Sequence, residues 1–364
     1  MRKIKVLIVD DSQLIRDILT SILSSDPRLE VVGTAEDPYV ARQKIKELNP
    51  DVLTLDVEMP KMNGVAFLKN LMRLRPMPVV MISTLTSEGS QITMQALELG
   101  AIDFVAKPAD LSRIMAEYQE QIVSKVIAAA GVSASKLHAI QLKLTQNDGK
   151  QPARTTSSIL KKPAVSDVNA KPARKIVAIG GSTGSLEALK ELLMQVKFTG
   201  KESIVVALHL PGKFTESYAK RLDSVLPVTV KEAESGEPMR EGHIYIAPGG
   251  YHLEVRKRAF GFECVVTEDE PVNLHRPSVE VLYDSVTKYG GGNAIAIILT
   301  GMGKDGSEAL GRVKNAGMQT FAQDEESSVV WGMPGAAVTE FNSVERRNVL
   351  NLGQLAAKVS ELGH

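Results

Sequence analysis

The chain has 364 residues, with 43 basic and 43 acidic side chains and a formal net charge of zero at pH 7. This length predicts two or three domains, and the balanced charge excludes a global field that would attract nucleic acid or a membrane surface. The single cysteine, Cys264, excludes an internal disulfide, and no apolar run is long enough to span a bilayer. We therefore expect a cytoplasmic protein with no direct membrane insertion.

The first third of the chain alternates short apolar runs with amphipathic segments. Strands are expected at residues 3–10, 30–35, 52–56, 79–83 and 104–106, with helices between them. This alternation predicts an α/β fold of the flavodoxin-like (βα)5 type, with helices on both faces of a parallel sheet. The functional site of such a sheet lies at the carboxyl ends of its strands.

Polar residues stand at those strand ends. Asp10, Asp11 and Asp56 end two of the strands, and carboxylates with water and phosphate oxygens are the ligands that Mg²⁺ prefers. Lys107 offers a point charge for a phosphoryl oxygen and Ser83 a hydroxyl donor. A lone aspartate at such a position is usually a capping or solvated residue, but five polar groups in this order are poorly explained that way.

These positions resemble the receiver domain of response regulators over about the first 120 residues. The motifs are Ile8-Val9-Asp10-Asp11, Asp56 with Met59-Pro60-x-Met62-Asn63-Gly64, Ser83, and Lys107-Pro108. The resemblance implies that Asp56 accepts a phosphoryl group from a histidine kinase, with Mg²⁺ as the cofactor. It further implies that the Mg²⁺ ligands are Asp10, Asp11, Asp56 and the Glu58 carbonyl. The switch residues that it implies are Ser83, Phe104 and Lys107.

The hydrophobic periodicity fades between residues 131 and 175. A last helix is expected over 111–130, and residues 121–173 are interpreted as that helix end and a flexible basic linker, in which Ser, Thr, Ala, Pro and Lys dominate. A short helix near 137–144 is compatible with the pattern. The boundaries we predict are 1–120, 121–173 and 174–362.

The second half opens with Lys175–Ser185, KIVAIGGSTGS. Its first part reads as a buried parallel strand, and the leucines that follow have helical spacing. Ser182 thus lies in a strand-to-helix turn and fits a nucleophile-elbow pattern, Gly180-x-Ser182-x-Gly184. On this turn alone, a helix N-cap is the better interpretation of Ser182.

Further strands are expected at 203–208, 239–248, 294–299 and 319–322, with a hairpin of 251–256 and 262–266. They predict a doubly wound, mostly parallel α/β sheet with a small β-hairpin. Ser182, His209 and Asp305 each follow a different strand, and they are the residue types of a nucleophile, its base and the carboxylate that orients the base. Three such residues are weak evidence without geometry.

Two other classes of function compete with this one. Gly301-x-Gly303-x-x-Gly306 with Asp324 has the form of a dinucleotide-binding fingerprint, which would make the chain a receiver fused to an oxidoreductase. Asp305 inside that loop would place like charge beside a pyrophosphate. A DNA-binding response regulator would need a basic recognition element, and the linker is the only basic stretch, so we expect no nucleic-acid partner.

The second half resembles the CheB family of chemotaxis methylesterases. The motifs are Ile179–Gly184, Leu208–Pro211, His275–Val279, Leu299–Gly306 and Val330–Gly335, and Ser185 stands where the family often has glycine. The resemblance implies a serine hydrolase that removes methyl esters from glutamates of methylated chemoreceptors, releasing methanol, without a cofactor for the esterase. The same acyl chemistry permits deamidation of receptor glutamines. The implied catalytic residues are Ser182, His209 and Asp305, with Thr183 and Met302 at the oxyanion turn.

The combination of the two domains suggests regulation. Our hypothesis is that the unphosphorylated receiver covers the esterase cleft and that phosphorylation of Asp56 uncovers it.

Overall fold

The computed structural model describes residues 2–59, 62–83, 86–107, 116–148 and 171–363. It divides into two compact units, Met1–Ala153 and Arg154–His364, each with its own sheet. Among the described residues, no helix combines the length and apolar character needed to cross a bilayer.

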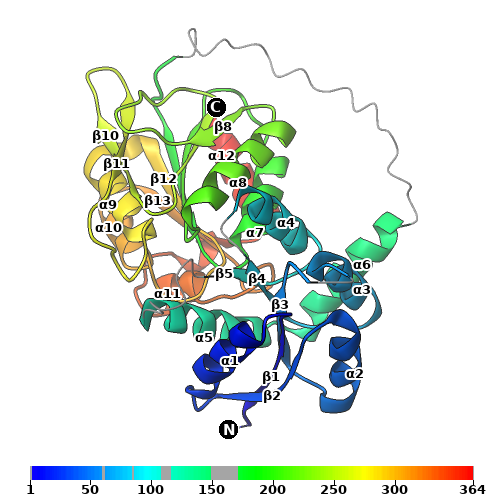
Figure 1. Ribbon diagram of the computed structural model, residues 1–364. Coiled ribbons are helices and arrows are strands. Elements are labelled where there is room, and N and C mark those ends of the chain that lie inside the picture. Colours follow the sequence, from blue (N-terminus) through cyan, green and yellow to red (C-terminus); the bar gives the residue numbers. More distant parts are fainter. Residues whose placement is uncertain (1, 60–61, 84–85, 108–115, 149–170, 364) are drawn as a thin grey trace. The chain divides into compact units, whose positions relative to one another are not determined.

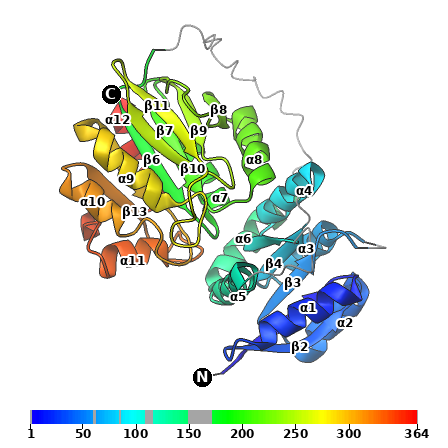
Figure 2. The same ribbon diagram turned by 60° about the vertical axis from the view of Figure 1, so that its left-hand side comes forward.

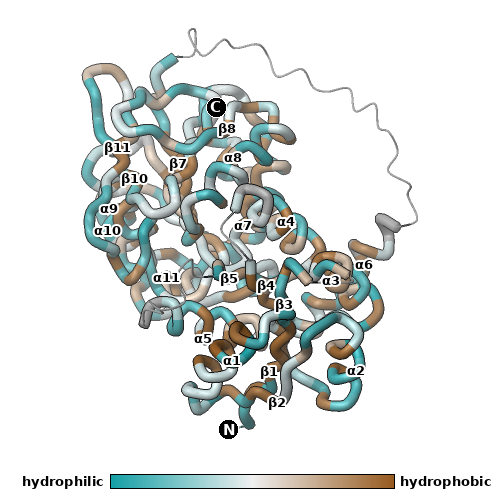
Figure 3. The backbone as a smooth tube through the Cα atoms, in the orientation of Figure 1, coloured by the Kyte–Doolittle hydropathy of each residue, from teal (hydrophilic) through white to brown (hydrophobic). Residues whose placement is uncertain are grey.

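The first unit is built on five parallel strands in the order β2-β1-β3-β4-β5 (Figure 1). The strands are β1 (Ile4–Val9), β2 (Leu29–Ala35), β3 (Val52–Asp56), β4 (Val79–Ser83) and β5 (Asp103–Ala106). The helices are α1 (Gln13–Ser24), α2 (Pro38–Leu48), α3 (Gly64–Leu74), α4 (Ser87–Glu98), α5 (Ala116–Ala130) and α6 (Ala134–Asp148). The predicted flavodoxin-like (βα)5 fold is confirmed, and Figure 3 shows the apolar character of its central strands.

The helix α6 is longer than the short helix that the sequence suggested. It packs against α3, where the Gln141 Nε2 group donates to the Arg73 carbonyl at 2.7 Å. Ile140 fills the space beside Gly100, whose φ of +100° suits glycine. The predicted helix start at 111 and most of the predicted linker, residues 149–170, lie outside the described residues, so the domain boundaries stay a prediction.

The second unit is a seven-stranded sheet in the order β14-β13-β12-β6-β7-β9-β8, and all of its strand pairs are parallel. The strands are β6 (Ile176–Gly181), β7 (Ser203–Leu208), β8 (Thr229–Glu232), β9 (His243–Ile246), β12 (Ala294–Ile298), β13 (Gln319–Gln323) and β14 (Val349–Leu350). A separate antiparallel hairpin joins β10 (His252–Lys257) to β11 (Phe262–Thr267). The predicted doubly wound sheet with a small hairpin is confirmed.

Helices cover both faces of this sheet (Figure 2). They are α7 (Ser185–Gln195), α8 (Gly212–Val225), α9 (Val279–Tyr289), α10 (Ala309–Asn315), α11 (Met333–Thr339) and α12 (Leu352–Gly363), with 3₁₀ turns at Gly291–Asn293 and Arg346–Asn348. The α7 helix packs against α12, and the Tyr218 hydroxyl of α8 donates to the Leu186 carbonyl of α7 at 2.7 Å. The α9 helix packs against α10 and against β10 of the hairpin.

The sequence missed β8 and β14, which form the two edges of the sheet. They have four and two residues, too few for a hydrophobic period to be visible. The central strands β6, β7 and β12 are buried along their whole length. A strand covered by helices on both faces has a continuous apolar sequence, which is why β7 and β12 were predicted within a residue, while β6 extends two residues beyond its predicted apolar run to Gly181.

Candidate functional site

The strand order of the second unit brings three chain segments together. β6 lies between β7 and β12, and the chain leaves β6 for β7 on one side before returning to β12 on the other. Such a reversal of strand order creates a crevice at the carboxyl ends of the strands. Ser182 follows β6, His209 follows β7, and Asp305 lies in the loop after β12, so the fold places all three at this crevice.

The side chains of these residues form a hydrogen-bonded row. The Nδ1 atom of His209 lies 3.1 Å from the Ser182 hydroxyl oxygen, and its Nε2 atom lies 2.8 Å from Asp305 Oδ2. A carboxylate only accepts hydrogen bonds, so in the neutral ring Nε2 carries the proton and Nδ1 is the acceptor for the serine hydroxyl. This is the arrangement that a base needs in order to remove the serine proton.

Asp305 is held by donors from two chain segments. Its Oδ1 accepts from Asn273 Nδ2 at 2.9 Å and from the Ser278 hydroxyl at 2.8 Å, and its Oδ2 accepts from the Val279 amide at 2.6 Å. Burial alone raises the pKa of Asp305, but the hydrogen bonds and charge of His209, with those of Asn273 and Ser278, outweigh it and hold the pKa below its ordinary value. Asp305 is therefore a carboxylate across the physiological pH range.

The loop before α9 supplies residues to which the sequence analysis gave no role. Asn273 and Leu274 both have positive φ angles, 53° and 66°, in a tight turn closed by two hydrogen bonds between Val272 and His275. The turn lays the His275 ring flat on His209, with ring centroids 3.5 Å apart. The stack fixes the plane of the His209 ring. The His275–Val279 motif was the sequence signal, but motif spacing does not show which side chain faces the base.

The turn that holds Ser182 is tightly packed against the loop after β12. The Ser182 amide donates to the Thr300 carbonyl at 3.0 Å, and a Cβ on Gly301 would lie 2.9 Å from the Ser182 nitrogen. The N-cap of α7 is Gly184, with a φ of 78°, so the capping interpretation of Ser182 is wrong.

Two residues flank this contact and were predicted to serve the oxyanion. Thr183 is buried, and its carbonyl accepts from the Thr300 hydroxyl at 3.0 Å. Met302 follows Gly301, and its backbone amide donates to no group among the described residues. A free amide beside a nucleophile is the kind of donor that stabilises negative charge on a substrate oxygen.

The glycine-rich loop does not have the environment of a dinucleotide site. Gly306 has a φ of +76°, and a Cβ there would lie 2.4 Å from Val279, so this glycine permits close packing of the loop on α9. Asp305 points to His209, and the Asp324 carboxylate accepts from the Ser327 amide at 2.9 Å within its own turn. The oxidoreductase alternative is not supported.

A second cluster of polar residues lies at the carboxyl ends of β1, β3 and β5 in the first unit. Lys107 Nζ lies 3.0 Å from Asp10 Oδ2 and 2.9 Å from Asp56 Oδ1. Asp11 joins them, since Asp10, Asp11 and Asp56 each place a carboxylate oxygen within 4.8 Å of the others. A Cβ on Gly64 would lie 1.9 Å from the Asp56 carbonyl, so only glycine permits this close approach.

The charges in this cluster are not balanced. Burial, the charge of Asp10 and incomplete compensation by Lys107 raise the pKa of Asp56 from 3.8 to about 6. Asp56 Oδ2 is buried and has no hydrogen-bond partner among the described residues. An orphaned carboxylate oxygen within a group of three acids fits a hard divalent cation such as Mg²⁺. The predicted ligands Asp10, Asp11 and Asp56 therefore suit the ion that receiver domains use.

Ser83 and Phe104, two of the three predicted switch residues, are buried in the first unit. The Ser83 hydroxyl accepts from Thr93 Oγ1 at 2.6 Å and lies 3.4 Å from the Gly89 carbonyl, so it contacts α4. Phe104 is 1% exposed, and its carbonyl accepts from Lys125 Nζ at 2.7 Å. The Ser83 side chain thus contacts α4, and the Phe104 ring contacts α5, where Lys125 Nζ lies 5.1 Å from the ring centroid.

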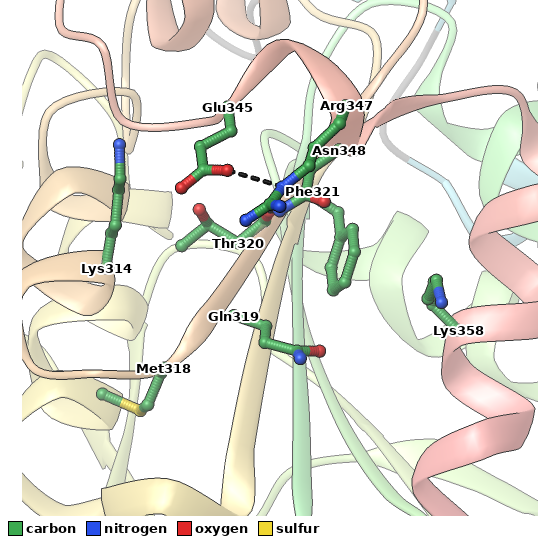
Figure 4. Close-up of a pocket in the computed structure, with 9 residues that line it drawn as sticks. All are labelled: Lys314, Met318, Gln319, Thr320, Phe321, Glu345, Arg347, Asn348 and Lys358. Carbon is green, nitrogen blue, oxygen red and sulfur yellow. Dashed lines mark hydrogen bonds and ion pairs between the residues drawn. The ribbon is translucent and has the colours of Figure 1, made fainter.

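A pocket of about 270 Å³ lies at the start of β13 (Figure 4), and none of Ser182, His209 and Asp305 is among its lining residues. Three cations line it, but each has a partner: Arg347 pairs with Glu345 at 2.7 Å, Lys358 with Glu361 at 2.8 Å, and Lys314 Nζ donates to the Asn342 carbonyl. Since catalytic residues gather at the opposite, carboxyl ends of the strands, this pocket is not part of the site.

Comparison with known proteins identifies both units. The profile of the family described as CheB methylesterase matches residues 177–359, and that of the response regulator receiver domain matches residues 6–119. A protein from Hydrogenovibrio crunogenus named protein-glutamate methylesterase/protein-glutamine glutaminase is 47% identical, with 100% of this chain and 99% of that protein covered. A protein from Hahella chejuensis, named protein-glutamate methylesterase/protein-glutamine glutaminase 1, is 51% identical, with 98% of this chain and 95% of that protein covered. The crystal structure of the Thermotoga maritima CheB methylesterase catalytic domain is 38% identical, covers 52% of this chain and 98% of that domain, and has a TM-score of 0.49.

Proposed function

The chain belongs to the CheB methylesterase family, and we propose that Ser182, His209 and Asp305 carry out its ester hydrolysis. The protein is a methylesterase with a response-regulator receiver domain, and the names of its relatives extend the activity to glutamine deamidation. The observation that supports the assignment best is the row of hydrogen bonds from Ser182 through His209 to Asp305, at 3.1 and 2.8 Å.

The reaction proceeds through an ester on the enzyme. Ser182 Oγ attacks the carbonyl carbon of a glutamyl methyl ester while His209 Nδ1 takes the hydroxyl proton. Asp305 stabilises the resulting imidazolium through its bond to Nε2. When the carbon–oxygen bond to methoxide breaks, His209 returns the proton and methanol leaves. Water then attacks the glutamyl-serine ester with His209 again as the base, which frees glutamate and restores Ser182.

The negative oxygen that forms during each attack needs donors. The free amide of Met302 and the turn at Thr183 are the proposed oxyanion groups, and one such donor contributes about 3–4 kcal/mol to catalysis. A glutamine side chain enters the same reaction with ammonia as the leaving group, so one site serves both activities.

The receiver domain implies a phosphodonor kinase, and we propose Asp56 as the residue that is phosphorylated. Asp10, Asp11, Asp56 and the Glu58 carbonyl would hold a divalent cation, which would supply the charge neutralisation that phosphoryl transfer requires. Lys107 contacts the Asp56 carboxylate and binds a phosphoryl oxygen in the product. Ser83 and Phe104, packed between strand edge and helices, would carry the change to the domain surface.

Methanol release from methylated chemoreceptor membranes tests both assignments. We expect Ser182→Ala to abolish release, and we expect a small phosphodonor with Mg²⁺ to raise release by the wild type and not by Asp56→Asn. Release by Ser182→Ala at the wild-type rate would remove Ser182 as nucleophile. Equal stimulation of Asp56→Asn would remove Asp56 as acceptor.

The regulatory hypothesis is tested separately. If the unphosphorylated receiver covers the esterase cleft, removal of residues 1–170 raises basal methanol release. Unchanged or lower release would contradict an inhibitory receiver.

A further inference from the structure

His252 is a buried histidine to which the proposed reaction gives no role. It is the first residue of β10 and is 1% exposed. Its Nδ1 atom lies 3.2 Å from the backbone nitrogen of Ser278, and its Nε2 atom lies 3.0 Å from the carbonyl oxygen of Glu270. Both ring nitrogens therefore contact the backbone of the loop that precedes α9.

These two contacts define the protonation of the ring. A backbone N–H only donates and a backbone carbonyl only accepts, so Nδ1 of His252 accepts from Ser278 and Nε2–H donates to Glu270. The neutral ring thus links the backbone at Glu270 to the backbone at Ser278, on either side of the loop. That loop carries Asn273, which donates to Asp305, and His275, which stacks on His209.

The contact at Ser278 leads directly to the catalytic carboxylate. The Ser278 hydroxyl donates to Asp305 Oδ1 at 2.8 Å and accepts from the Glu280 amide at 3.1 Å, which makes Ser278 the N-cap of α9. The next amide, that of Val279, donates to Asp305 Oδ2. Residues at the start of α9 thus donate hydrogen bonds to both oxygens of Asp305, and the positive end of the helix dipole stabilises the negative charge of the carboxylate.

We propose that His252 is a positioning residue for the reaction: it fixes the Ser278 backbone, and through it the orientation of Asp305 and the tautomer of His209. The proposal rests on the function assigned above to the Ser182 triad. It also gives the β10–β11 hairpin a role. Within the part of the chain that the structure describes, no hydrogen bond joins the seven-stranded sheet to Ser278, and His252 of the hairpin provides this support.

Three variants separate positioning from general structural support. His252→Leu removes both polar contacts at similar volume. His252→Asn restores an acceptor at the δ position, where it can meet the Ser278 amide. Ser285→Ala is the matched control, because Ser285 is also buried and accepts from the Val255 amide at 2.9 Å, a second link between α9 and β10 that does not lead to Asp305.

We expect His252→Leu to lower kcat for methanol release about 10- to 100-fold with little change in KM, as a small misplacement of a catalytic group does. We expect His252→Asn and Ser285→Ala to stay within about threefold of the wild type. The downfield imidazole N–H resonance of His209, which reports its bond to Asp305, should broaden or shift in His252→Leu and remain in Ser285→Ala.

Three outcomes would overturn the proposal: wild-type kcat in His252→Leu, an unchanged His209 resonance in that variant, or equal losses in Ser285→Ala. Ser182→Ala, assayed beside them in the full-length protein, keeps the two hypotheses apart. An inactive Ser182→Ala with a fully active His252→Leu would refute only the role of His252. An active Ser182→Ala would refute the triad itself.

Discussion

Replacing Asp56 with asparagine should stabilise the first unit at neutral pH. Asp56 is 2% exposed, and burial together with the charge of Asp10 raises its pKa from 3.8 to about 6. The fold therefore holds this side chain more favourably as the acid than as the carboxylate. Asparagine has nearly the same shape and no charge, and Lys107 keeps Asp10 as a partner at 3.0 Å.

The sign and size of the effect follow from the pKa. Because the pKa in the folded state exceeds that in the unfolded state, the folded state binds more protons between about pH 4 and pH 6. The contribution of Asp56 to the free energy of unfolding is thus most favourable below that window and falls as pH rises through it. The difference between 3.8 and about 6 corresponds to roughly 3 kcal/mol. We expect the free energy of unfolding of Asp56→Asn to exceed that of the wild type by up to this amount at pH 7.5, and by almost nothing near pH 4.

Urea unfolding at several pH values measures this difference. Far-UV circular dichroism follows both units, whereas the single tryptophan, Trp331, lies in the second unit and provides an internal control. The Trp331 transition should not move in Asp56→Asn. Added Mg²⁺ should stabilise the wild type at pH 7.5 and reduce the difference in free energy of unfolding between the variant and the wild type. Equal free energies of unfolding at pH 7.5, or a difference that grows toward pH 4, would refute the reasoning.

Three further predictions concern the second unit. Asp305→Asn should lower kcat for methanol release about 10³–10⁴-fold, since asparagine has one acceptor oxygen and its NH2 group must face either His209 Nε2 or the donors Asn273 and Ser278; a loss under tenfold would contradict the triad. Leu274→Asn should raise the free energy of unfolding by about 1 kcal/mol in urea titrations, because asparagine tolerates the φ of 66°; no gain would argue against backbone strain there. Gly301→Ala should lower kcat at least about 100-fold by displacing Ser182, whereas Gly292→Ala, which meets open space, should match the wild type.

The sequence was most informative where burial was complete. The strands β6, β7 and β12 have apolar residues on both faces, so the strands themselves and the polar residues that follow them could be predicted. Because parallel strands end at one edge, the meeting of Ser182, His209 and Asp305 could be anticipated as a hypothesis.

What the sequence could not reveal were contacts made by the loop before α9. Asn273 and Leu274 take up a left-handed turn that neither residue type requires, and the stacking of His275 on His209 follows from that turn. The role of His252 was likewise invisible, because its two partners are backbone groups that any sequence would supply. Contacts of a side chain with distant backbone leave no pattern in composition or spacing.

The two buried aspartates at strand edges show why similar sequence positions lead to opposite chemistry. Asp305 receives hydrogen bonds on both oxygens, from His209, two polar side chains and the start of α9, and these hold its pKa below the ordinary value despite burial. Asp56 shares one lysine with Asp10, and one of its oxygens has no hydrogen-bond partner among the described residues. Burial and the charge of Asp10 therefore raise the pKa of Asp56. A carboxylate whose two oxygens both accept hydrogen bonds is suited to orient a base and to remain unreactive. A carboxylate with an oxygen that lacks a donor is stabilised most by a bound cation, and that oxygen has a lone pair free to form a new bond, which is what a phosphoryl acceptor needs.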